Sequence, residues 1–308
     1  MILCCGESLI DMIHEPTISG AESYVPRAGG AIFNTAIGLG RLGCKTGLLS
    51  GISTDQFGTQ LIDELDASNV QTDHVIRSDR PTTLAFVKLT NGHASYSFFD
   101  ENSAGRMISK SDLPAEIDDV SALYFGGISL ACEPGAQTYA AFAQQNAKDC
   151  VVMLDPNIRP SFIADEERFR SRIEGMLKLA DIVKVSDEDL DWIIPGAAGF
   201  EEKIAQLREM GPTIVILTRG REGAQAWLPD GGMIFVASQK ADVIDTVGAG
   251  DTFNAGVLAS LLDANLLSKK ATCSLSGLQL ETALRFGAKV AAINVGRAGA
   301  NPPWRAEV

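Results

Sequence analysis

The sequence predicts an α/β fold, a doubly wound and mainly parallel sheet with helices on both faces. Short apolar runs typical of buried strands alternate with longer segments of helical periodicity over most of the 308 residues. A hydrophobic share of 45% is enough for one large core. No Pro-, Gly- or Ser-rich linker interrupts the chain, so we expect a single domain over residues 1–308.

Six apolar runs are the expected strands of this sheet, at residues 2–6, 46–51, 122–125, 150–154, 182–185 and 213–217. Helical periodicity between them predicts helices over residues 33–42, 56–67, 135–148, 166–179 and 200–208. The runs 224–228 and 233–236 flank a Pro-Asp-Gly-Gly turn and predict a hairpin. Two helices then close the chain.

Two stretches, about residues 12–28 and 81–106, do not follow this alternation. The first is polar and irregular, and the second holds two β-rich runs joined by Thr90-Asn91-Gly92-His93. Asn-Gly between such runs is a strong hairpin signal. We expect the two stretches to pair into a small β-sheet beside the carboxyl ends of the parallel strands, where α/β proteins bind ligands. The sequence therefore predicts a lid inserted into the domain.

Charge and cysteine content limit the partners of the protein. There are 39 acidic and 26 basic residues, and the net charge of −13 works against binding to nucleic acid or anionic membranes. The six cysteines show no CxxC pair and are expected to be free thiols of a reducing compartment. No window approaches the roughly 18 to 20 apolar residues of a membrane span. We expect a cytoplasmic protein with small-molecule partners.

The sharpest local signal is DTVGAGDTFNAG at residues 245–256. It places Gly248, Ala249 and Gly250 at the start of a helix, where unpaired N–H groups and the helix dipole favour a phosphate. Asp251 at the end of this loop can accept the proton of an attacking hydroxyl. The alternative is that Asp251 only caps the helix, because Asp is a favoured capping residue.

A second signal is GGAIFNTAIGLGRLG at residues 29–43. Its last six residues spell GxGxxG, but they lie within or at the end of a helical stretch, whereas a dinucleotide fingerprint stands between a strand and a helix start. We therefore reject a nicotinamide-dependent oxidoreductase. Gly29 and Gly30 at a helix entry, with Asn34 one turn later, can instead bind sugar hydroxyls. Close helix packing alone is the competing explanation.

In this order and separation, the two segments resemble the two signatures of the ribokinase-like (PfkB) carbohydrate kinases. The first signature is matched by Gly29, Gly30, Asn34, Ala36, Arg41, Leu42 and Gly43, and residues 245–251 match the second without a gap. The resemblance covers essentially the whole chain, including the lid and the tail at residues 276–303. It implies a ribokinase-like fold that transfers the γ-phosphoryl group of ATP, with Mg²⁺, to a hydroxyl of a small carbohydrate.

By this resemblance, Asp251 is the catalytic base, and Gly248, Ala249 and Gly250 form the anion hole, with Gly248 and Gly250 also contacting the nucleotide. The remaining substrate residues follow from matching positions.

Asp11, just after the first strand, resembles the carboxylate that holds two sugar hydroxyls beside Gly29, Gly30 and Asn34. Arg159, in LDPNIRP, resembles the arginine of a DxNxR motif that contacts substrate or nucleotide phosphate. A surface ion pair is the alternative role for Arg159.

The nucleotide site is implied further along the chain. Thr218, Gly220 and Gly223 match the TxGxxG nucleotide loop of the family, and Asn294 lies where the adenine pocket closes. Asp245 is expected near a monovalent cation, for which K⁺ is the candidate.

The sequence departs from the family at one element. The family usually carries NxxE after the strand that matches residues 181–185, whereas this chain reads Ser186-Asp187-Glu188-Asp189. Ser186 and Asp189 take the two places, with Ser186 on the nucleotide side. Asp is shorter than Glu but still an oxygen ligand, so Asp189 is expected to contact the water shell of Mg²⁺.

The substrate is inferred from the branch of the family. GESLID, RPTTLAFV, DPNIRPSF and GANPPW are similar to fructokinases and 2-keto-3-deoxygluconate kinases, and D-fructose is the first choice. Tyr96, Phe98, Asp100 and Arg106 in the lid are the expected specificity residues. Asp100 disfavours a keto acid with its carboxylate, although Arg106 could compensate.

A protein of another class stays open, a sugar-sensing protein that keeps the kinase fold without catalysis. The intact Asp251 speaks against it, because a sensor has no chemical need for that carboxylate. Exposed apolar strands of the lid favour a homodimer.

Overall fold

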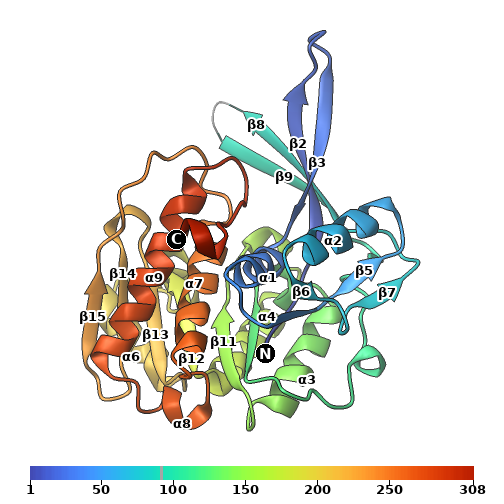
Figure 1. Ribbon diagram of the computed structural model, residues 1–308. Coiled ribbons are helices and arrows are strands. Elements are labelled where there is room, and N and C mark those ends of the chain that lie inside the picture. The colour runs from blue at the N-terminus through green and yellow to red at the C-terminus, as the bar shows by residue number, and fades with distance from the viewer. Residues whose placement is uncertain (91–92) are drawn as a thin grey trace.

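The computed structural model describes residues 1–90 and 93–308 (Figure 1). Within these residues, nine strands form the main sheet in the order β15-β14-β13-β12-β11-β10-β1-β4-β6. Pairing is parallel from β6 to β13, and β14 and β15 are antiparallel. The strands are β1 (Ile2–Cys5), β4 (Thr46–Leu49), β6 (Val70–Gln71), β10 (Ala122–Gly126), β11 (Val151–Asp155), β12 (Ile182–Ser186), β13 (Ile214–Thr218), β14 (Ala224–Trp227) and β15 (Met233–Val236).

Helices cover both faces of the sheet, as the doubly wound prediction requires. One face packs against α1 (Ala31–Arg41), α2 (Gln56–Ala67), α7 (Ala249–Asp263) and α9 (Gly277–Val295), and the other against α3 (Gly135–Asn146), α4 (Glu166–Leu179), α5 (Asp187–Ile193) and α6 (Phe200–Glu209). Alternation along each strand divides the core: in β1, Ile2 and Cys4 join the first cluster, and Leu3 and Cys5 the second.

Shorter helical turns complete the chain: α8 (Lys269–Thr272) and the 3₁₀ turns η1 (Lys110–Asp112), η2 (Gly127–Leu130), η3 (Pro160–Phe162), η4 (Gly220–Glu222) and η5 (Arg305–Glu307). In the part of the chain that the structure describes, no helix has both the length and the apolar character needed to cross a membrane.

The predicted small sheet is present and projects from the main body (Figure 1). Its order is β3 (Glu22–Gly29), β2 (Leu9–Pro16), β8 (Leu84–Thr90) and β9 (His93–Phe99). The polar stretch after residue 12 is therefore regular, because β2 pairs with β3 over its whole length and with β8 over residues 10–13. The predicted Asn91-Gly92 turn lies outside the described residues, and the flanking strands pair as a hairpin.

The predicted strand at 46–51 divides into two strands. After β4 the chain leaves the main sheet, and β5 (Gly51–Ser53) pairs with β7 (Ile76–Ser78). The backbone at Gly51 lies so close to residue 104 that an added Cβ would be 2.1 Å from the Ala104 carbonyl oxygen. This contact belongs to a segment far along the chain, which is why strand periodicity did not reveal the break.

Candidate active site

Parallel pairing brings the carboxyl ends of β1, β10, β11, β12 and β13 to one edge of the sheet, and α7 begins above this edge. The N-cap of α7 is Gly248, which has a left-handed φ of 73°. A Cβ at this position would lie 2.6 Å from the Ala300 Cβ, so glycine satisfies both the backbone conformation and the space. Because Gly248 is the cap, Asp251 lies one turn further on and is not the capping residue.

Asp251 meets Asn34 of α1 across 217 residues of chain. The Asn34 side-chain amide donates a hydrogen bond of 2.9 Å to Asp251 Oδ2. Asp251 is only 8% exposed, and burial is the main cause that raises its pKa to about 7. The Asn34 hydrogen bond opposes this rise, the charge of Asp155 adds to it, and Lys184 opposes it. A carboxyl group with a pKa near neutrality suits a general base.

The predicted sugar-binding residues lie side by side at the base of the small sheet. Asp11 stands in β2, and a Cβ on Gly29 would be 2.3 Å from Asp11 Oδ2, so no larger residue fits there without moving the carboxylate. Gly30 is the N-cap of α1 with a φ of 107°, and Asn34 follows in the first turn. Burial raises the pKa of Asp11 to about 6.

Glu7 is a buried carboxylate that sequence reasoning did not single out. Its Oε1 accepts a hydrogen bond of 3.0 Å from the Ala31 backbone N–H, and its Oε2 one of 3.3 Å from Ser129. Burial raises the pKa of Glu7. A Cβ on Gly127 would lie 2.2 Å from Oε1, so glycine makes room for the carboxylate. The available signal was an acidic residue two positions after the end of a buried strand, in GESLID.

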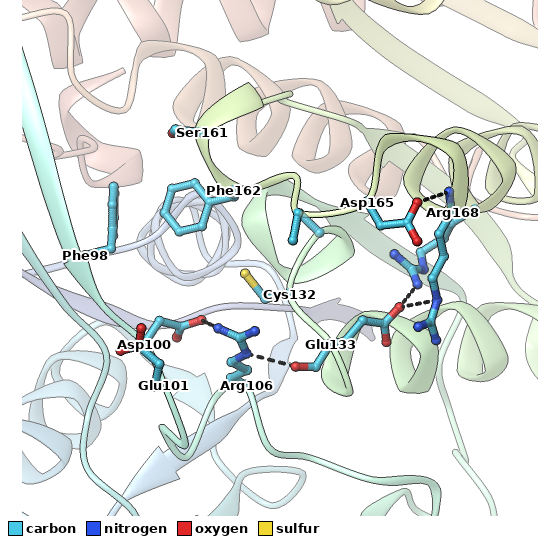
Figure 2. A pocket seen from close by; sticks show the side chains of 13 residues that line it. Phe98, Asp100, Glu101, Arg106, Cys132, Glu133, Ser161, Phe162, Asp165 and Arg168 are labelled. Atoms are coloured by element: carbon cyan, nitrogen blue, oxygen red, sulfur yellow. Dashed lines mark hydrogen bonds and ion pairs between the residues drawn. The ribbon is translucent and has the colours of Figure 1, made fainter.

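A charged cavity of about 510 Å³ lies between β9 and η3 (Figure 2). Phe98 and Phe162 pack edge to face on one side, with ring centroids 4.2 Å apart and an angle of 67° between the ring planes. Arg106 lies 3.5 Å from Asp100 Oδ2 through its Nη1, and its Nε donates to the Glu133 carbonyl oxygen at 2.8 Å. Three predicted specificity residues, Phe98, Asp100 and Arg106, thus line one cavity.

The two other predicted substrate residues are Tyr96 and Arg159. The Tyr96 side chain lies outside the part of the structure that is described. Arg159 is exposed just before η3, and the only hydrogen bond of its side chain within the described residues goes to the neighbouring Ile158 carbonyl oxygen at 3.1 Å.

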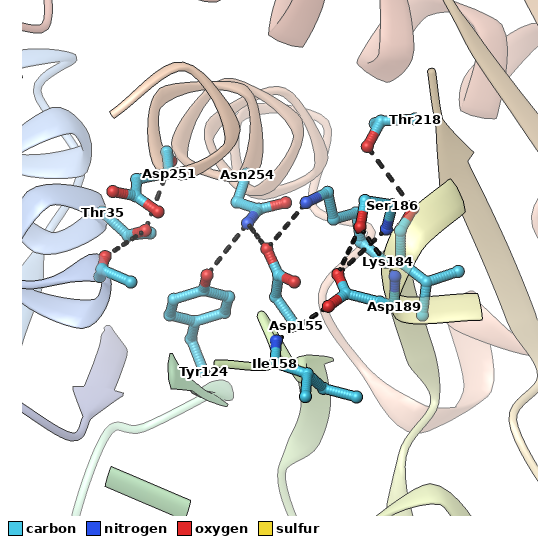
Figure 3. A network of polar contacts seen from close by, with 12 residues as sticks. Thr35, Tyr124, Asp155, Ile158, Lys184, Ser186, Asp189, Thr218, Asp251 and Asn254 are labelled. Atoms are coloured by element: carbon cyan, nitrogen blue, oxygen red, sulfur yellow. Dashed lines mark hydrogen bonds and ion pairs between the residues drawn. The ribbon is translucent and has the colours of Figure 1, made fainter. Parts of the chain in front are cut away.

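A buried polar network lies below the first turns of α7 (Figure 3). Lys184 Nζ is 3.0 Å from Asp155 Oδ2. The Asn254 amide donates to the same oxygen at 2.7 Å and to the Tyr124 hydroxyl at 2.9 Å. Despite burial, the pKa of Lys184 is raised, because the negative charge of Asp155 favours the ammonium form. Sequence reasoning assigned no role to Asp155 or Lys184. Asp155 is the first residue of the DxNxR motif, but only its Arg159 was considered, and Lys184 stands in a run that reads as a buried strand.

A second cavity, of about 740 Å³, lies on the other side of the α7 start. It is lined by Thr218 at the end of β13, by Gly220 and Gly223 after it, by Ala249 and Gly250, and by small apolar residues of α9. The predicted nucleotide loop and anion hole thus share one cavity. Its mixture of apolar side chains and backbone donors suits a purine nucleotide.

Asn294 and Asp245 brace the loop before α7. Asn294 is fully buried and does not line the cavity; its amide donates to the Val247 carbonyl at 3.0 Å, and its Oδ1 accepts from Asn301 at 2.8 Å. The Asp245 carboxylate accepts from Val247 at 3.0 Å and from Gly299 at 2.9 Å. Both side chains tie this loop to the C-terminal segment.

Ser186 and Asp189 form a capping box at the start of α5. Asp189 Oδ2 accepts hydrogen bonds from the Ser186 N–H at 3.1 Å and its hydroxyl at 2.8 Å, and Oδ1 accepts from Ile158 at 2.7 Å. Both carboxylate oxygens therefore already have protein donors. Over the described residues, no three His, Cys, Asp or Glu side chains are grouped as metal ligands.

Backbone N–H groups at a helix start, a buried base beside them and a nucleotide-sized cavity form a site for transferring a phosphoryl group to a hydroxyl. The protein is accordingly an α/β phosphotransferase. The family model for pfkB family carbohydrate kinases matches residues 1–307, and the chain belongs to this family. The predicted family, fold class and kinase activity are thereby confirmed.

Similar proteins include several fructokinases. The chain is 49% identical over 288 residues to a fructokinase of Rhizobium leguminosarum bv. trifolii, covering 93% of this chain and 86% of that protein. It is 32% identical over 315 residues to a probable chloroplastic fructokinase of Arabidopsis thaliana, covering 98% and 79%. The structure of a Xylella fastidiosa fructokinase with bound ATP has a TM-score of 0.87 at 29% identity, covering 97% of this chain and 93% of that one.

Proposed function

We propose that the protein is a fructokinase that transfers the γ-phosphoryl group of ATP to a hydroxyl of D-fructose. The observation that carries this proposal is the buried Asp251, held by Asn34 beside the open N–H groups of α7. The choice of fructose rests on the similarity to proteins named fructokinase, and ATP is the nucleotide bound to the Xylella fastidiosa protein.

The proposed reaction uses Asp251 as the base. As the sugar oxygen attacks the γ-phosphorus, its proton passes to the Asp251 carboxylate, and the new O–P bond forms. The bond from the γ-phosphorus to the β,γ-bridging oxygen breaks, and its electron pair leaves with ADP. The N–H groups of Ala249 and Gly250 stabilise the charge on the transferred group. Asp11 and Asn34 orient the sugar.

We propose that Mg²⁺ enters the site with ATP, coordinated mainly by phosphate oxygens and water. Asp189 does not fit as a direct ligand, because both of its oxygens accept protein hydrogen bonds; its contact with the metal is through water. Asp245 remains the proposed neighbour of a K⁺ ion. Both assignments concern ions whose contribution is electrostatic, and the transfer step above does not depend on their geometry.

The small sheet is proposed to act as a lid within the single domain, over about residues 12–28 and 81–106. It carries a row of aromatic rings packed edge to face. The ring centroids of Tyr24 and Phe86 are 5.1 Å apart, and those of Phe86 and Phe99 are 5.5 Å apart. Phe99 is 58% exposed. We propose that a second copy of the chain covers this row, giving a homodimer. A cytoplasmic location agrees with the free state of the cysteines among the described residues.

The test is ADP release from Mg·ATP by the purified protein, with D-fructose, 2-keto-3-deoxygluconate, ribose and adenosine as separate acceptors. Fructose should give the highest kcat/KM. Asp251→Asn should lower kcat by about 10³-fold while ATP affinity, measured by calorimetry, stays within about threefold. Turnover with the keto acid alone would keep the mechanism and replace the substrate. No turnover with any acceptor, together with sugar binding, would favour the sugar-sensing protein.

A further inference from the structure

Lys184 of β12 brings a positive charge to the start of α7, where Asn34 of α1 also contacts the helix. It lies near the carboxyl end of β12 and is 5% exposed. A Cβ on Gly250 would be 3.4 Å from Lys184 Nζ, so the ammonium group lies close to the first turn of α7 (Figure 3). The helix start therefore combines two features that attract anions, its own N–H groups and a buried cation.

An ion pair and a hydrogen bond hold the ammonium group in place. Asp155 pairs with Nζ at 3.0 Å, and Asn254 of α7 fixes the same Asp155 oxygen at 2.7 Å. Burying a charge is strongly unfavourable unless it is paired, and a well-packed apolar pair would often hold the elements together at least as stably. A purely structural role thus gives little reason for charges at this position.

Several polar atoms of Asp155, Asn254 and Lys184 lack a hydrogen-bond partner within the described residues. Asp155 Oδ1 and Asn254 Oδ1 are buried without a hydrogen-bond partner within the described residues. Of the three protons on Lys184 Nζ, only one has a hydrogen-bond acceptor in that same part of the chain. Natural proteins rarely leave such groups unpaired, so a group bound beside Gly250 is expected to complete the set.

The charge balance of the site points in the same direction. Glu7, Asp155 and Asp251 are buried carboxylates, and the charges of Glu7 and Asp155 both act on Asp251. A phosphoryl group that enters beside them meets like charges at low dielectric. The positive charge of the Lys184 ammonium offsets the negative charge of these carboxylates. The ammonium lies beside the position that the phosphoryl group would take.

We propose that Lys184 donates a charged hydrogen bond to the phosphoryl group bound at the first turn of α7, and that Asp155 is the residue that positions its ammonium. This assignment rests on the proposed phosphoryl transfer from a nucleotide and adds to it a catalytic contact from β12. Asn254 and Tyr124 keep the Asp155 carboxylate oriented toward Lys184.

The test separates charge from packing with the double variant Lys184→Gln/Asp155→Asn, which keeps a hydrogen bond between the two positions but removes both charges. Calorimetry compares the affinities for Mg·AMP-PNP and for adenosine, which lacks phosphates. We expect the affinity for Mg·AMP-PNP to fall at least tenfold with that for adenosine unchanged, and kcat to fall at least about 100-fold. Lys184→Arg, which keeps the charge, should recover part of the lost affinity.

Lys203 supplies a matched control, because it is also a buried lysine paired with an aspartate, Asp191, at 2.7 Å, but on α6. Lys203→Gln/Asp191→Asn should leave both affinities and kcat within about threefold of the parent protein. The proposal is overturned if the folded Lys184→Gln/Asp155→Asn variant binds Mg·AMP-PNP like the parent, or loses adenosine affinity in the same proportion. The binding comparison needs no sugar, so a wrong acceptor would not obscure the result. If that variant does not fold, Lys184→Arg decides: it must bind Mg·AMP-PNP with at least a tenth of the parent affinity.

Discussion

Asn34 and Asp251 are joined by a 2.9 Å hydrogen bond between the amide nitrogen and Oδ2, and this bond connects the start of α1 to the start of α7. Within the described chain, Asp251 Oδ1 accepts no hydrogen bond from another residue. Asn34 therefore holds Oδ2 of the carboxylate and leaves Oδ1 for the hydroxyl that is to be deprotonated.

The pH dependence of kcat/KM should follow the ionisation of Asp251. Burial raises the pKa of Asp251 to about 7, and only the ionised form can act as a base. Activity should therefore rise with pH through about 7 and level off above it. Asn34→Leu removes a donor that favours the ionised form, so its acid limb should move to higher pH. Rates measured from about pH 5.5 to about pH 8.5 that show no acid limb would contradict the assignment of the base.

Asp251→Asn should make the folded protein more stable at alkaline pH. The native pKa of about 7 lies above the ordinary value of 3.8, so the ionised carboxylate destabilises the native state. The cost is complete above pH 7 and disappears as the pH falls toward 3.8. At pH 8 the variant should gain on the order of 2–4 kcal/mol in the free energy of unfolding.

Urea unfolding at pH 8 and pH 5 measures this difference. The gain should be smaller at pH 5, because the native parent protein is then mostly protonated at Asp251. An equal gain at both pH values would show that the substitution acts through packing instead of charge.

Gly29→Ala should impair sugar binding without affecting the nucleotide. The new Cβ would lie 2.3 Å from Asp11 Oδ2, so the Asp11 carboxylate must move. We expect the KM for the sugar to rise at least about tenfold, corresponding to about 1.4 kcal/mol, and the KM for ATP to stay unchanged. Steady-state kinetics with each substrate varied in turn gives both values.

The matched control for this prediction is Gly175→Ala in α4, where an added Cβ would meet no atom within 4 Å. This change should stabilise the protein by about 0.5–1 kcal/mol and leave both KM values alone. If Gly29→Ala behaves like this control, Asp11 does not hold the sugar.

Phe99→Asp should weaken the proposed dimer. Phe99 ends the aromatic row on the small sheet and is 58% exposed, so a charge there would be buried by a second copy. Light scattering at micromolar concentration should give a dimer for the parent protein and a monomer for the variant. Leu278→Asp, at an apolar position on α9 that is 75% exposed, should remain dimeric. A monomeric parent protein would rule out the dimer under these conditions.

Local sequence pattern was sufficient for much of the fold and for the two signature segments. Alternating apolar runs predicted β1, β10, β11, β12 and β13, because parallel strands buried on both faces need continuous apolar residues. Glycines and Asp251 stood out because a helix start that receives an anion needs small residues and a nearby carboxylate. These features depend only on neighbours along the chain.

The order of the strands decided which other residues lie near Asp251. Glu7, Asp155 and Lys184 lie in three different strand-loop segments, and only their parallel arrangement places them near Asp251. The burial that raises the pKa of Asp251 comes from α1 and the sheet. Likewise, Asn294 reads as a nucleotide residue in sequence, but contacts with Val247 and Asn301 place it beneath the loop. Sequence determined which residues could form a phosphoryl-transfer site; tertiary structure decided their distances and charges, because both depend on segments that meet only in the folded protein.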